Sequence, residues 1–452
     1  MGFTACPQRD ESSPPAGPDP VCRSARRPGR TPAATQTVCP KRAIRMARAG
    51  LPFLPPMVQT DPYPLREVAM NTVIDSDQHL YEYRGLWEEH IDPAMRHEAI
   101  RFADDPLGHV RVVWREHVLA VADVQTPGET DAIGERRRRE REGLPPLVRY
   151  DETLPRDYWD PAARAERLAA LGVDEAIVFP NYGLIWERTL SRELAALRAN
   201  MAAWNRWCEA VIVEGKGRLH PVAHLTLRDL PWLEAQLARL SAAGVRAAMI
   251  APALVDGKPL SHPDLDRAWA AFVHHGITPC FHVADQPKVF DEAWYKDRNE
   301  LGVSVVDTVF LYVPAALALT DLILNGVLER HLELRIGIVE LSAVWVPLFL
   351  MMLDGGTDFV RRLSGQTSKL SMRPSDYFRR LVRVSSFAYE LPLNLERMLG
   401  GSDLLMCCSD YPHSEGTARP IEDYAAPGRF AARPADAPGL FHNNAAFLLR
   451  KL

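Results

Sequence analysis

The stretch VIDSDQHLYE, residues 73–82, begins as a short β-branched strand and then places three carboxylates and a histidine within eight residues. Polar groups at the end of an apolar strand are costly to bury unless something pairs with them. A divalent metal, a cationic partner and plain solvent are the candidate partners. Because Asp77 and His79 are two residues apart, a strand would point both to the same side. Mixed carboxylate and imidazole donors suit Zn²⁺, Mn²⁺ or Fe²⁺.

Downstream of this stretch, short apolar runs alternate with amphipathic stretches. Leu230–Ala243 has apolar residues at helical spacing and ends before Gly244, and Pro263–His275 repeats the arrangement before Gly276. Strands alternating with helices predict parallel pairing. We expect eight strands, at Val73–Asp75, Glu175–Phe179, Leu219–Ala223, Ala247–Ile250, Ile277–Phe281, Leu334–Val339, Leu381–Ser385 and Leu404–Cys408.

Eight such units in roughly 380 residues predict an α/β fold of the (β/α)8 TIM-barrel type, spanning residues 71–452. A doubly wound open sheet is the alternative. That fold usually carries a glycine-rich loop after its first strand, and this sequence has none there.

Two segments depart from the repeat. Residues 95–160 predict a hairpin followed by the charge run GERRRRERE, inserted between the first strand and its helix. An insertion after a barrel strand lies on the catalytic face, so we expect the hairpin to help cover the site, with the charge run solvated. Residues 1–70 hold 13 of the 37 prolines and nine arginines, without any persistent period, and this composition predicts a disordered tail.

The bulk composition is that of an ordinary soluble protein, with 47% hydrophobic and 25% charged residues. The net charge of −5 argues against a nucleic-acid partner. The seven cysteines show no metal-type spacing and indicate reduced thiols in the cytoplasm. No secretory signal is visible, and the apolar run Leu341–Leu353 is too short to span a bilayer, so we expect no membrane partner. We interpret Leu341–Leu353 as a buried helix. The longer run Val309–Leu328 predicts a helix packed on the sheet.

In a barrel, the residues that end the strands converge on one mouth. Besides the first strand, the fifth ends at His282, the sixth at Glu340 and the eighth at Asp410, with His413 three residues later. One such ending means little, but four on separate strands predict a site. Three further polar residues each have two alternative roles. His413 either orients Asp410 or caps its loop, and Glu82 either supports a ligand or starts a helix. His224 ends the third strand and faces either substrate or the rim.

The chain resembles the amidohydrolase-related family, in the branch that includes aminocarboxymuconate-semialdehyde decarboxylase and γ-resorcylate decarboxylase. The matching stretches are IDSDQHLYE, DPAARAERLAALGVDEAIVFPNYG, LERHLELRIGIVELSAVWVPLFLMMLD, LMCCSDYPHSEG and NNAAFLL. The resemblance implies a metal-dependent barrel enzyme with Asp77, His79, His282 and Asp410 as ligands. It also implies one divalent metal, zinc as the first expectation and manganese, iron or magnesium as alternatives.

Two departures from the family pattern bear on mechanism. Relatives with two metals carry a lysine after strand four, whereas this strand reads VRAAMIAPAL and the next lysine is Lys258, so a single metal is expected. Many relatives have a histidine after strand six, where this chain has Glu340. Glu340 is therefore the candidate proton carrier, or a residue that supports a ligand.

Three functions remain open. The leading one is non-oxidative decarboxylation of a small carboxylated molecule, in which a metal stabilises developing negative charge and an acid protonates the carbon that loses CO₂. Metal-assisted hydrolysis of an amide, ester or lactone, with Asp410 as general base, is the alternative. A non-catalytic metal-binding barrel is the third, and a decayed site would purify without metal. The expected partner is a small-molecule substrate, with a homodimer as a further option.

Overall fold

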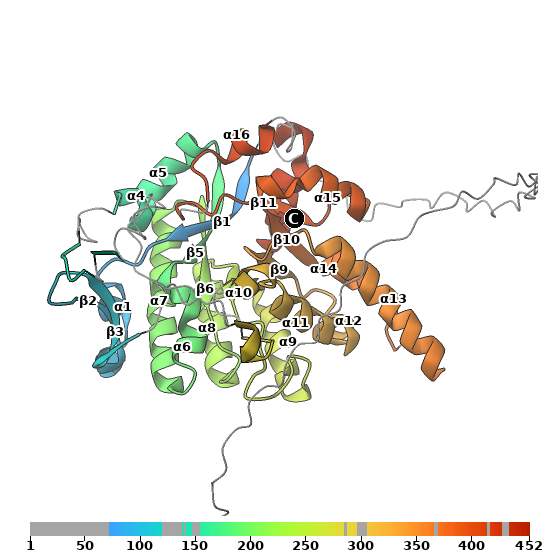
Figure 1. Ribbon diagram of the computed structural model, residues 1–452, viewed down its shortest axis with the longest axis horizontal. Helices are drawn as coiled ribbons and strands as arrows, with labels where there is room; N and C mark the ends of the chain where they lie inside the picture. Colours follow the sequence, from blue (N-terminus) through green and yellow to red (C-terminus); the bar gives the residue numbers. More distant parts are fainter. Residues whose placement is uncertain are drawn as a thin grey trace, which may run out of the picture. The chain divides into compact units, whose positions relative to one another are not determined.

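The computed structural model describes residues 72–119, 138–139, 142–146, 154–283, 287–295, 305–365, 369–413, 416–426 and 434–452. Within these ranges eight parallel strands form one sheet in the order β1-β5-β6-β7-β8-β9-β10-β11 (Figure 1). Each predicted strand is present, and the (β/α)8 class is confirmed. The bounds are β1 Ile74–Leu80, β5 Glu175–Pro180, β6 Leu219–His224, β7 Ala247–Met249, β8 Thr278–His282, β9 Ile336–Val339, β10 Val382–Ser386 and β11 Leu405–Cys407.

The first and last strands meet and nearly close the barrel, which excludes the open doubly wound sheet. The Asp410 N–H donates to the Asp77 carbonyl and the His79 N–H to the Tyr411 carbonyl, both at 2.8 Å. The Ser76 hydroxyl donates to the Cys407 carbonyl, also at 2.8 Å. Asp77 and Asp410 thus come from opposite ends of the sequence to the same seam.

The helices on the outside of the barrel begin and end where local chemistry predicts. α8 spans Leu230–Ala243 as expected: the Asp229 side chain accepts from the Trp232 N–H, and Gly244 ends the helix at a φ of 96°. The stretch 263–275 opens with the short 3₁₀ helix η3, Pro263–Leu265, and continues as α9, Asp266–His275. The other long helices are α5 Pro161–Leu171, α7 Leu194–Glu214, α9 Asp266–His275, α11 Val313–Leu324, α13 Val346–Ser364, α14 Pro374–Leu381 and α15 Pro392–Leu399.

The expectation of a buried helix over Leu341–Leu353 is wrong in two respects. The helix α13 begins only at Val346 and runs to Ser364. It buries a single face through residues such as Leu350 and Leu353, while Leu348, Met351 and Met352 are exposed. An unbroken apolar run hides which of its residues face the core, because every position looks equally suited to burial. The stretch 309–328 does pack on the barrel, mainly as α11, with Leu319 and Leu322 fully buried.

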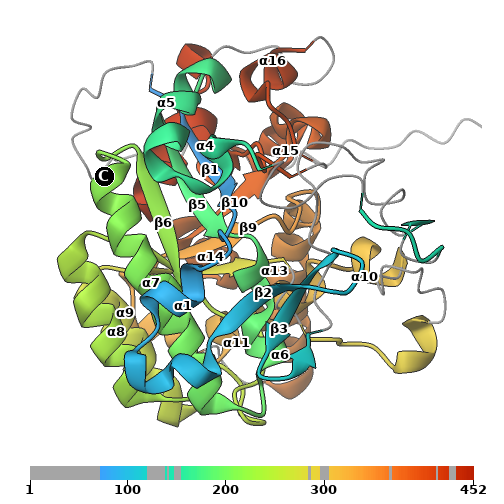
Figure 2. The same cartoon turned by 90° about the vertical axis from the view of Figure 1, so that its left-hand side faces the viewer.

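The predicted hairpin is confirmed as part of a three-stranded antiparallel sheet of β2 Ile100–Asp104, β3 Val110–Trp114 and β4 His117–Val118. The sheet lies beside α1, Leu86–His90 (Figure 2). It is tied to the barrel through Asn200 of α7, whose side chain accepts from the Ile100 N–H at 2.8 Å. The predicted tail at 1–70 and most of the charge run lie outside the described residues.

The structure bears on two expectations from composition, those about the cysteines and about membrane-spanning helices. Four of the seven cysteines, Cys208, Cys280, Cys407 and Cys408, lie in the described ranges, where they are buried and unpaired with one another. Among the helices that the structure describes, none combines the length and hydropathy needed to cross a membrane.

Candidate metal centre

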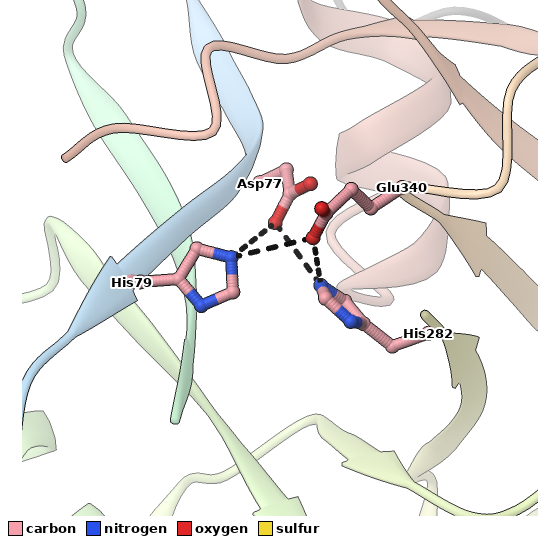
Figure 3. A group of neighbouring side chains, drawn as sticks. All are labelled: Asp77, His79, His282 and Glu340. Atoms are coloured by element: carbon pink, nitrogen blue, oxygen red, sulfur yellow. Dashed lines mark ion pairs between the residues drawn. The ribbon is translucent and has the colours of Figure 1, made fainter. Parts of the chain in front are cut away.

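Five side chains from four strands converge at the carboxyl end of the barrel. Asp77 and His79 lie on β1, and His282 ends β8. Glu340 and Asp410 follow β9 and β11 (Figure 3 shows the first four). The side chain of Glu340 is 14% exposed, and those of the other four are fully buried.

The ligand atoms form two overlapping groups, Asp77 with His79, His282 and Glu340, and Asp410 with His79, Glu340 and His413, and the atoms within each group lie within 4.8 Å of one another. Asp77 Oδ1 lies 3.5 Å from both His79 Nε2 and His282 Nε2. Glu340 Oε2 lies 3.2 Å from His282 Nε2 and 3.7 Å from His79 Nε2, and Asp410 Oδ1 lies 3.2 Å from His79 Nε2. Donors bound at about 2.1 Å around one tetrahedral ion would lie about 3.4 Å from one another.

The same atoms have no other hydrogen-bond partner among the described residues. They are both oxygens of Asp77, Oδ2 of Asp410, Oε2 of Glu340, and Nε2 of His79 and His282. The opposite ring nitrogens are occupied: Nδ1 of His79 donates to the Pro180 carbonyl at 2.8 Å, and Nδ1 of His282 to the Val283 carbonyl at 3.1 Å. A ligating histidine uses such a bond to fix its tautomer and aim its free nitrogen at the metal. The residues present therefore fit a divalent cation.

Two of the carboxylates sit on strained backbone. Glu340 has a φ of 52° and Asp410 a φ of 56°, in the left-handed region that costs non-glycine residues on the order of 1–3 kcal/mol. The Glu340 N–H donates to the Ser385 hydroxyl of β10 at 2.9 Å, which holds this turn. Such strain persists where the surroundings impose it, and here it turns two strand ends toward the centre.

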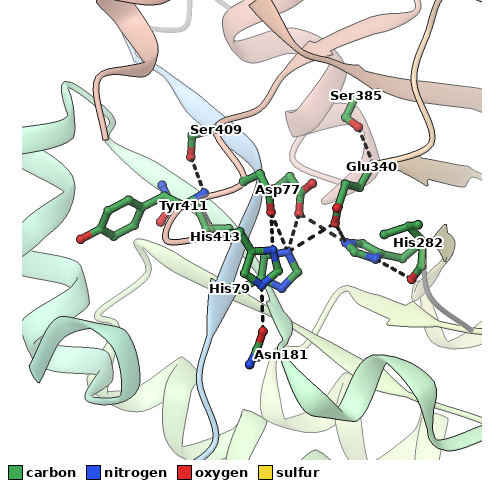
Figure 4. A network of polar contacts seen from close by, with 12 residues as sticks. Asp77, His79, Asn181, His282, Glu340, Ser385, Ser409, Tyr411 and His413 are labelled. Carbon is green, nitrogen blue, oxygen red and sulfur yellow. Dashed lines mark hydrogen bonds and ion pairs between the residues drawn. The ribbon is translucent and has the colours of Figure 1, made fainter. Parts of the chain in front are cut away.

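His413 extends the site toward β5 (Figure 4). Its Nδ1 lies 2.8 Å from Asp410 Oδ1 and its Nε2 lies 2.8 Å from Asn181 Oδ1. Its ring stacks on His79 with the centroids 3.8 Å apart. His413 thus contacts the Asp410 side chain and also closes its loop, because the His413 N–H donates to the Asp410 carbonyl at 2.8 Å. Sequence reasoning missed Asn181, although a polar residue directly after the second strand is the signal that could have found it.

Asp75 is a second residue that sequence reasoning left without a role. Its Oδ1 accepts from the N–H groups of Asp77, at 3.1 Å, and Ser409, at 3.0 Å. Its Oδ2 accepts from the Ser409 hydroxyl and, at 2.8 Å, from Gln78 Nε2. Burial raises the pKa of Asp75 to about 6 against these hydrogen bonds. Asp75 thereby fixes the backbone next to both Asp77 and Asp410.

The electrostatics of the cluster are those of carboxylates crowded away from water. Burial, and then the charge of Asp410, raise the pKa of Glu340 to about 7. Burial alone would raise the pKa of Asp410 as well, but His413 and His79 lower it. Burial would lower the pKa of His79, but hydrogen bonds to Asp410 and Asp77 raise it instead. The site thus favours positive charge at its centre.

Three other residues do not belong to the ligand-atom groups found among the described residues. Glu82 is buried and accepts from the N–H groups of Tyr182 and Gly183, at 3.0 and 2.8 Å, so it ties the end of β1 to the loop after β5. The backbone of His224 is held by Asn205 on α7. Neither Glu82 nor His224 belongs to the groups of closely spaced ligand atoms found among the described residues. Lys258 is half exposed and pairs with Asp264.

No family model matches the sequence, and no curated protein matches it. Solved structures do share its fold. An amidohydrolase from Mycobacterium avium subsp. paratuberculosis has a TM-score of 0.66 and 20% identity, over 84% of this chain and 99% of that one. A 5-carboxyvanillate decarboxylase from Novosphingobium aromaticivorans, complexed with manganese and 4-hydroxy-3-methoxy-5-nitrobenzoic acid, has a TM-score of 0.56 and 16% identity, over 84% and 96%. A 2,6-dihydroxybenzoate decarboxylase from Rhizobium has a TM-score of 0.53 and 14% identity, over 84% and 99%.

Proposed function

We propose that the chain is a metal-dependent enzyme of the amidohydrolase-related family that removes CO₂ from a small carboxylated organic molecule. One observation carries the proposal: buried donor atoms of Asp77, His79, His282, Glu340 and Asp410 gather in two overlapping groups at the mouth of a (β/α)8 barrel. In this fold that mouth is where active sites lie.

Asp77, His79, His282 and Asp410 would hold one divalent cation. Glu340 lies at the same spacing and stands beside the ion as a fifth donor or as a proton carrier. Zinc was the first expectation from sequence. Three oxygen donors and two nitrogen donors suit Mn²⁺ equally well, and the structurally similar 5-carboxyvanillate decarboxylase holds manganese. We therefore rank Mn²⁺ and Zn²⁺ together.

A bound divalent cation would stabilise the negative charge that develops on the substrate as CO₂ leaves. The carbon–carboxylate bond breaks, and its electron pair remains on the carbon. Glu340 would then donate its carboxyl proton to that carbon, because this side chain reaches the centre and keeps a slight opening to solvent. His413 holds Asp410 in orientation through Nδ1 while Asn181 fixes the far side of its ring.

Hydrolysis is the second candidate, because one solved structure that shares the fold carries the description amidohydrolase. In that reaction Asp410 would take a proton from an attacking water. The two candidates make different products from different substrates. A panel of hydroxybenzoic acids followed by CO₂ release, beside a panel of esters, lactones and amides followed by acid release, separates them.

The metal is tested first. We expect the purified protein to bind one equivalent of Mn²⁺ or Zn²⁺, and His282→Ala to lose most of it while remaining folded. His331→Ala is the matched control, because His331 pairs with Asp266 at the outer surface and should leave metal content unchanged. A full equivalent retained by folded His282→Ala would remove His282 from the proposed ligands.

The proton carrier is tested next with Glu340→Gln, which keeps the shape of the side chain and removes its proton-donating group. We expect turnover to fall by roughly 10²–10⁴-fold with metal content unchanged. Glu333→Gln, on the exposed side of the barrel, is the control. Loss of metal from Glu340→Gln would instead make Glu340 a ligand, and wild-type turnover would exclude it from proton transfer.

A further inference from the structure

Glu390, a buried carboxylate, connects the loops that follow β9 and β10. It lies in the 3₁₀ helix η5, Ala388–Glu390, just after β10, and is 7% exposed. Both of its carboxylate oxygens accept from the Ala343 N–H, at 3.3 and 3.2 Å. Ala343 lies 47 residues earlier in the chain and only three residues after Glu340. One side chain therefore holds the turn that carries Glu340 against the next strand of the barrel.

This turn needs support because Glu340, with a φ of 52°, and Ser342, with a φ of 60°, adopt left-handed conformations that are strained for non-glycine residues. Such strain persists only where the surrounding structure imposes it. The Ser385 hydroxyl accepts from the Glu340 N–H at 2.9 Å (Figure 4). The Trp345 indole N–H donates to the Ser342 carbonyl at 2.8 Å. Glu390 adds a third contact, at the residue that follows Ser342.

Local structure accounts for only part of what Glu390 does. The Phe387 N–H donates to Glu390 Oε2 at 3.2 Å, and the Glu390 N–H donates to the Phe387 carbonyl at 3.0 Å, so the residue also closes its own 3₁₀ helix. Burial raises the pKa of Glu390 against the hydrogen bonds that the carboxylate accepts. A neutral side chain with one acceptor oxygen could close this short helix without placing a carboxylate away from water. The contact with Ala343 is what a local cap leaves unexplained.

We propose that Glu390 is a positioning residue of the candidate site, which fixes through Ala343 the turn that directs Glu340 toward the metal centre. The inference rests on the proposed function, because Glu340 is the residue through which Glu390 acts. Glu340 Oε2 lies 3.2 Å from His282 Nε2, whereas Glu390 belongs to neither group of closely spaced ligand atoms found in the described part of the chain. Glu390 therefore acts through the direction of one side chain and not by contact with metal or substrate.

Removal of this contact should lower turnover and leave the binding of substrate and metal unchanged. We expect Glu390→Ala to lower kcat by roughly 10–100-fold with KM and metal content unchanged, because a misplacement of about 1 Å at a reacting group has an effect of this size.

Glu329→Ala is the matched control. Glu329 is another carboxylate that holds a loop, since it accepts from the Ser371 N–H at 3.1 Å and from the Ser371 hydroxyl at 3.0 Å. It lies in α12, Val327–Arg330, which precedes β9 and so leads into the barrel at the end opposite to the mouth. Glu329→Ala should lower the melting temperature and keep wild-type turnover.

A double-mutant cycle decides whether Glu390 acts through Glu340. In a chain that already carries Glu340→Gln, we expect Glu390→Ala to cause no further fall in turnover. An equal fall in both backgrounds would mean that Glu390 acts by another route, and wild-type turnover of folded Glu390→Ala would mean that it does not act at all; either result overturns the proposal. If Glu390→Ala does not fold, Glu390→Gln, which keeps one of the two acceptor oxygens, takes its place and should show a smaller loss with the same dependence on Glu340.

The position of Glu340 gives a readout that needs no substrate. We expect crystal structures of the Mn²⁺-loaded wild type and Glu390→Ala to show Glu340 Oε2 displaced by about 1 Å or more from His282 Nε2 in the variant. A Glu340 carboxylate that does not move would overturn the proposal. This comparison still decides if the wild type releases no CO₂ from any acid in the panel, a result that would overturn only the proposed decarboxylation.

Discussion

At the scale of single residues, the candidate site depends on a carboxylate that is not among its proposed ligands. Asp75 receives four hydrogen bonds, two of them from the backbone N–H groups of Asp77 and Ser409. Ser409 directly precedes Asp410, so one side chain fixes the main chain beside two proposed ligands on opposite edges of the seam. Residues that orient ligands in this way typically contribute 10–100-fold to metal affinity.

We therefore predict that Asp75→Asn weakens Mn²⁺ or Co²⁺ binding by about 10-fold or more. Asparagine keeps one acceptor oxygen but turns an N–H₂ group toward the Gln78 amide and the Ser409 hydroxyl. Metal titration gives the affinity, and the visible spectrum of bound Co²⁺ reports ligand geometry, which general destabilisation would leave unchanged. Asp92→Asn, at an exposed 3₁₀-helix cap that asparagine also satisfies, is the control. An unchanged affinity and spectrum would make Asp75 only a folding residue.

At the scale of elements, the sequence predicted best where one local rule acts. All eight strands were predictable because each is a short apolar run that alternates with amphipathic stretches, and α8 was predictable to both ends because Asp229 and Gly244 cap it. The exposed face of α13 was not predictable, because an apolar run does not reveal which side meets the core. Asn181 carries one weak signal, its place directly after a strand, but the roles of Asn181 and Asp75 depend on contacts with residues far along the chain, Asn181 with His413 and Asp75 with Ser409.

The amino ends of β5 and β6 are joined to the C-terminus of the chain by Glu175. Burial alone would raise the pKa of Glu175, but hydrogen bonds from His220 and Lys451 lower it to about 2. His220 Nε2 lies 2.6 Å from the carboxylate, and burial lowers the pKa of this imidazole. We therefore assign the ion pair to Lys451 and a neutral hydrogen bond to His220.

Because the folded-state pKa of Glu175 is lowered, its stabilisation is complete above about pH 4.5 and disappears as the pH falls toward 2. The side chain is 22% exposed, so we expect Glu175→Gln to lower the free energy of unfolding by about 1–2 kcal/mol at pH 6. In urea unfolding, the difference in the free energy of unfolding between wild type and Glu175→Gln should shrink steadily as the pH falls from 4.5 to 2. Glu333→Gln, at an exposed residue, is the control. If Glu175→Gln lowers the free energy of unfolding by the same amount at every pH, the lost stability comes from packing and not from the charge of Glu175.

At the scale of the whole molecule, the fold is anchored just after the proline-rich segment. The Val73 N–H donates to Asp174 at 2.8 Å, and the Thr72 hydroxyl lies 2.9 Å from His442 Nδ1, so the chain is tied down two residues before β1. We predict that a chain beginning at Met70, which keeps both contacts, matches the full chain in melting temperature and metal content.

A chain beginning at Asp75 is the matched comparison, because it loses both anchors and the first residue of β1. It should melt several degrees lower, since a loss of about 1–2 kcal/mol shifts the melting temperature of a large domain by a few degrees. Differential scanning calorimetry of the three chains decides the question. If the chain beginning at Met70 melts as low as the one beginning at Asp75, residues 1–69 contribute to stability, and the composition argument for a dispensable segment is wrong.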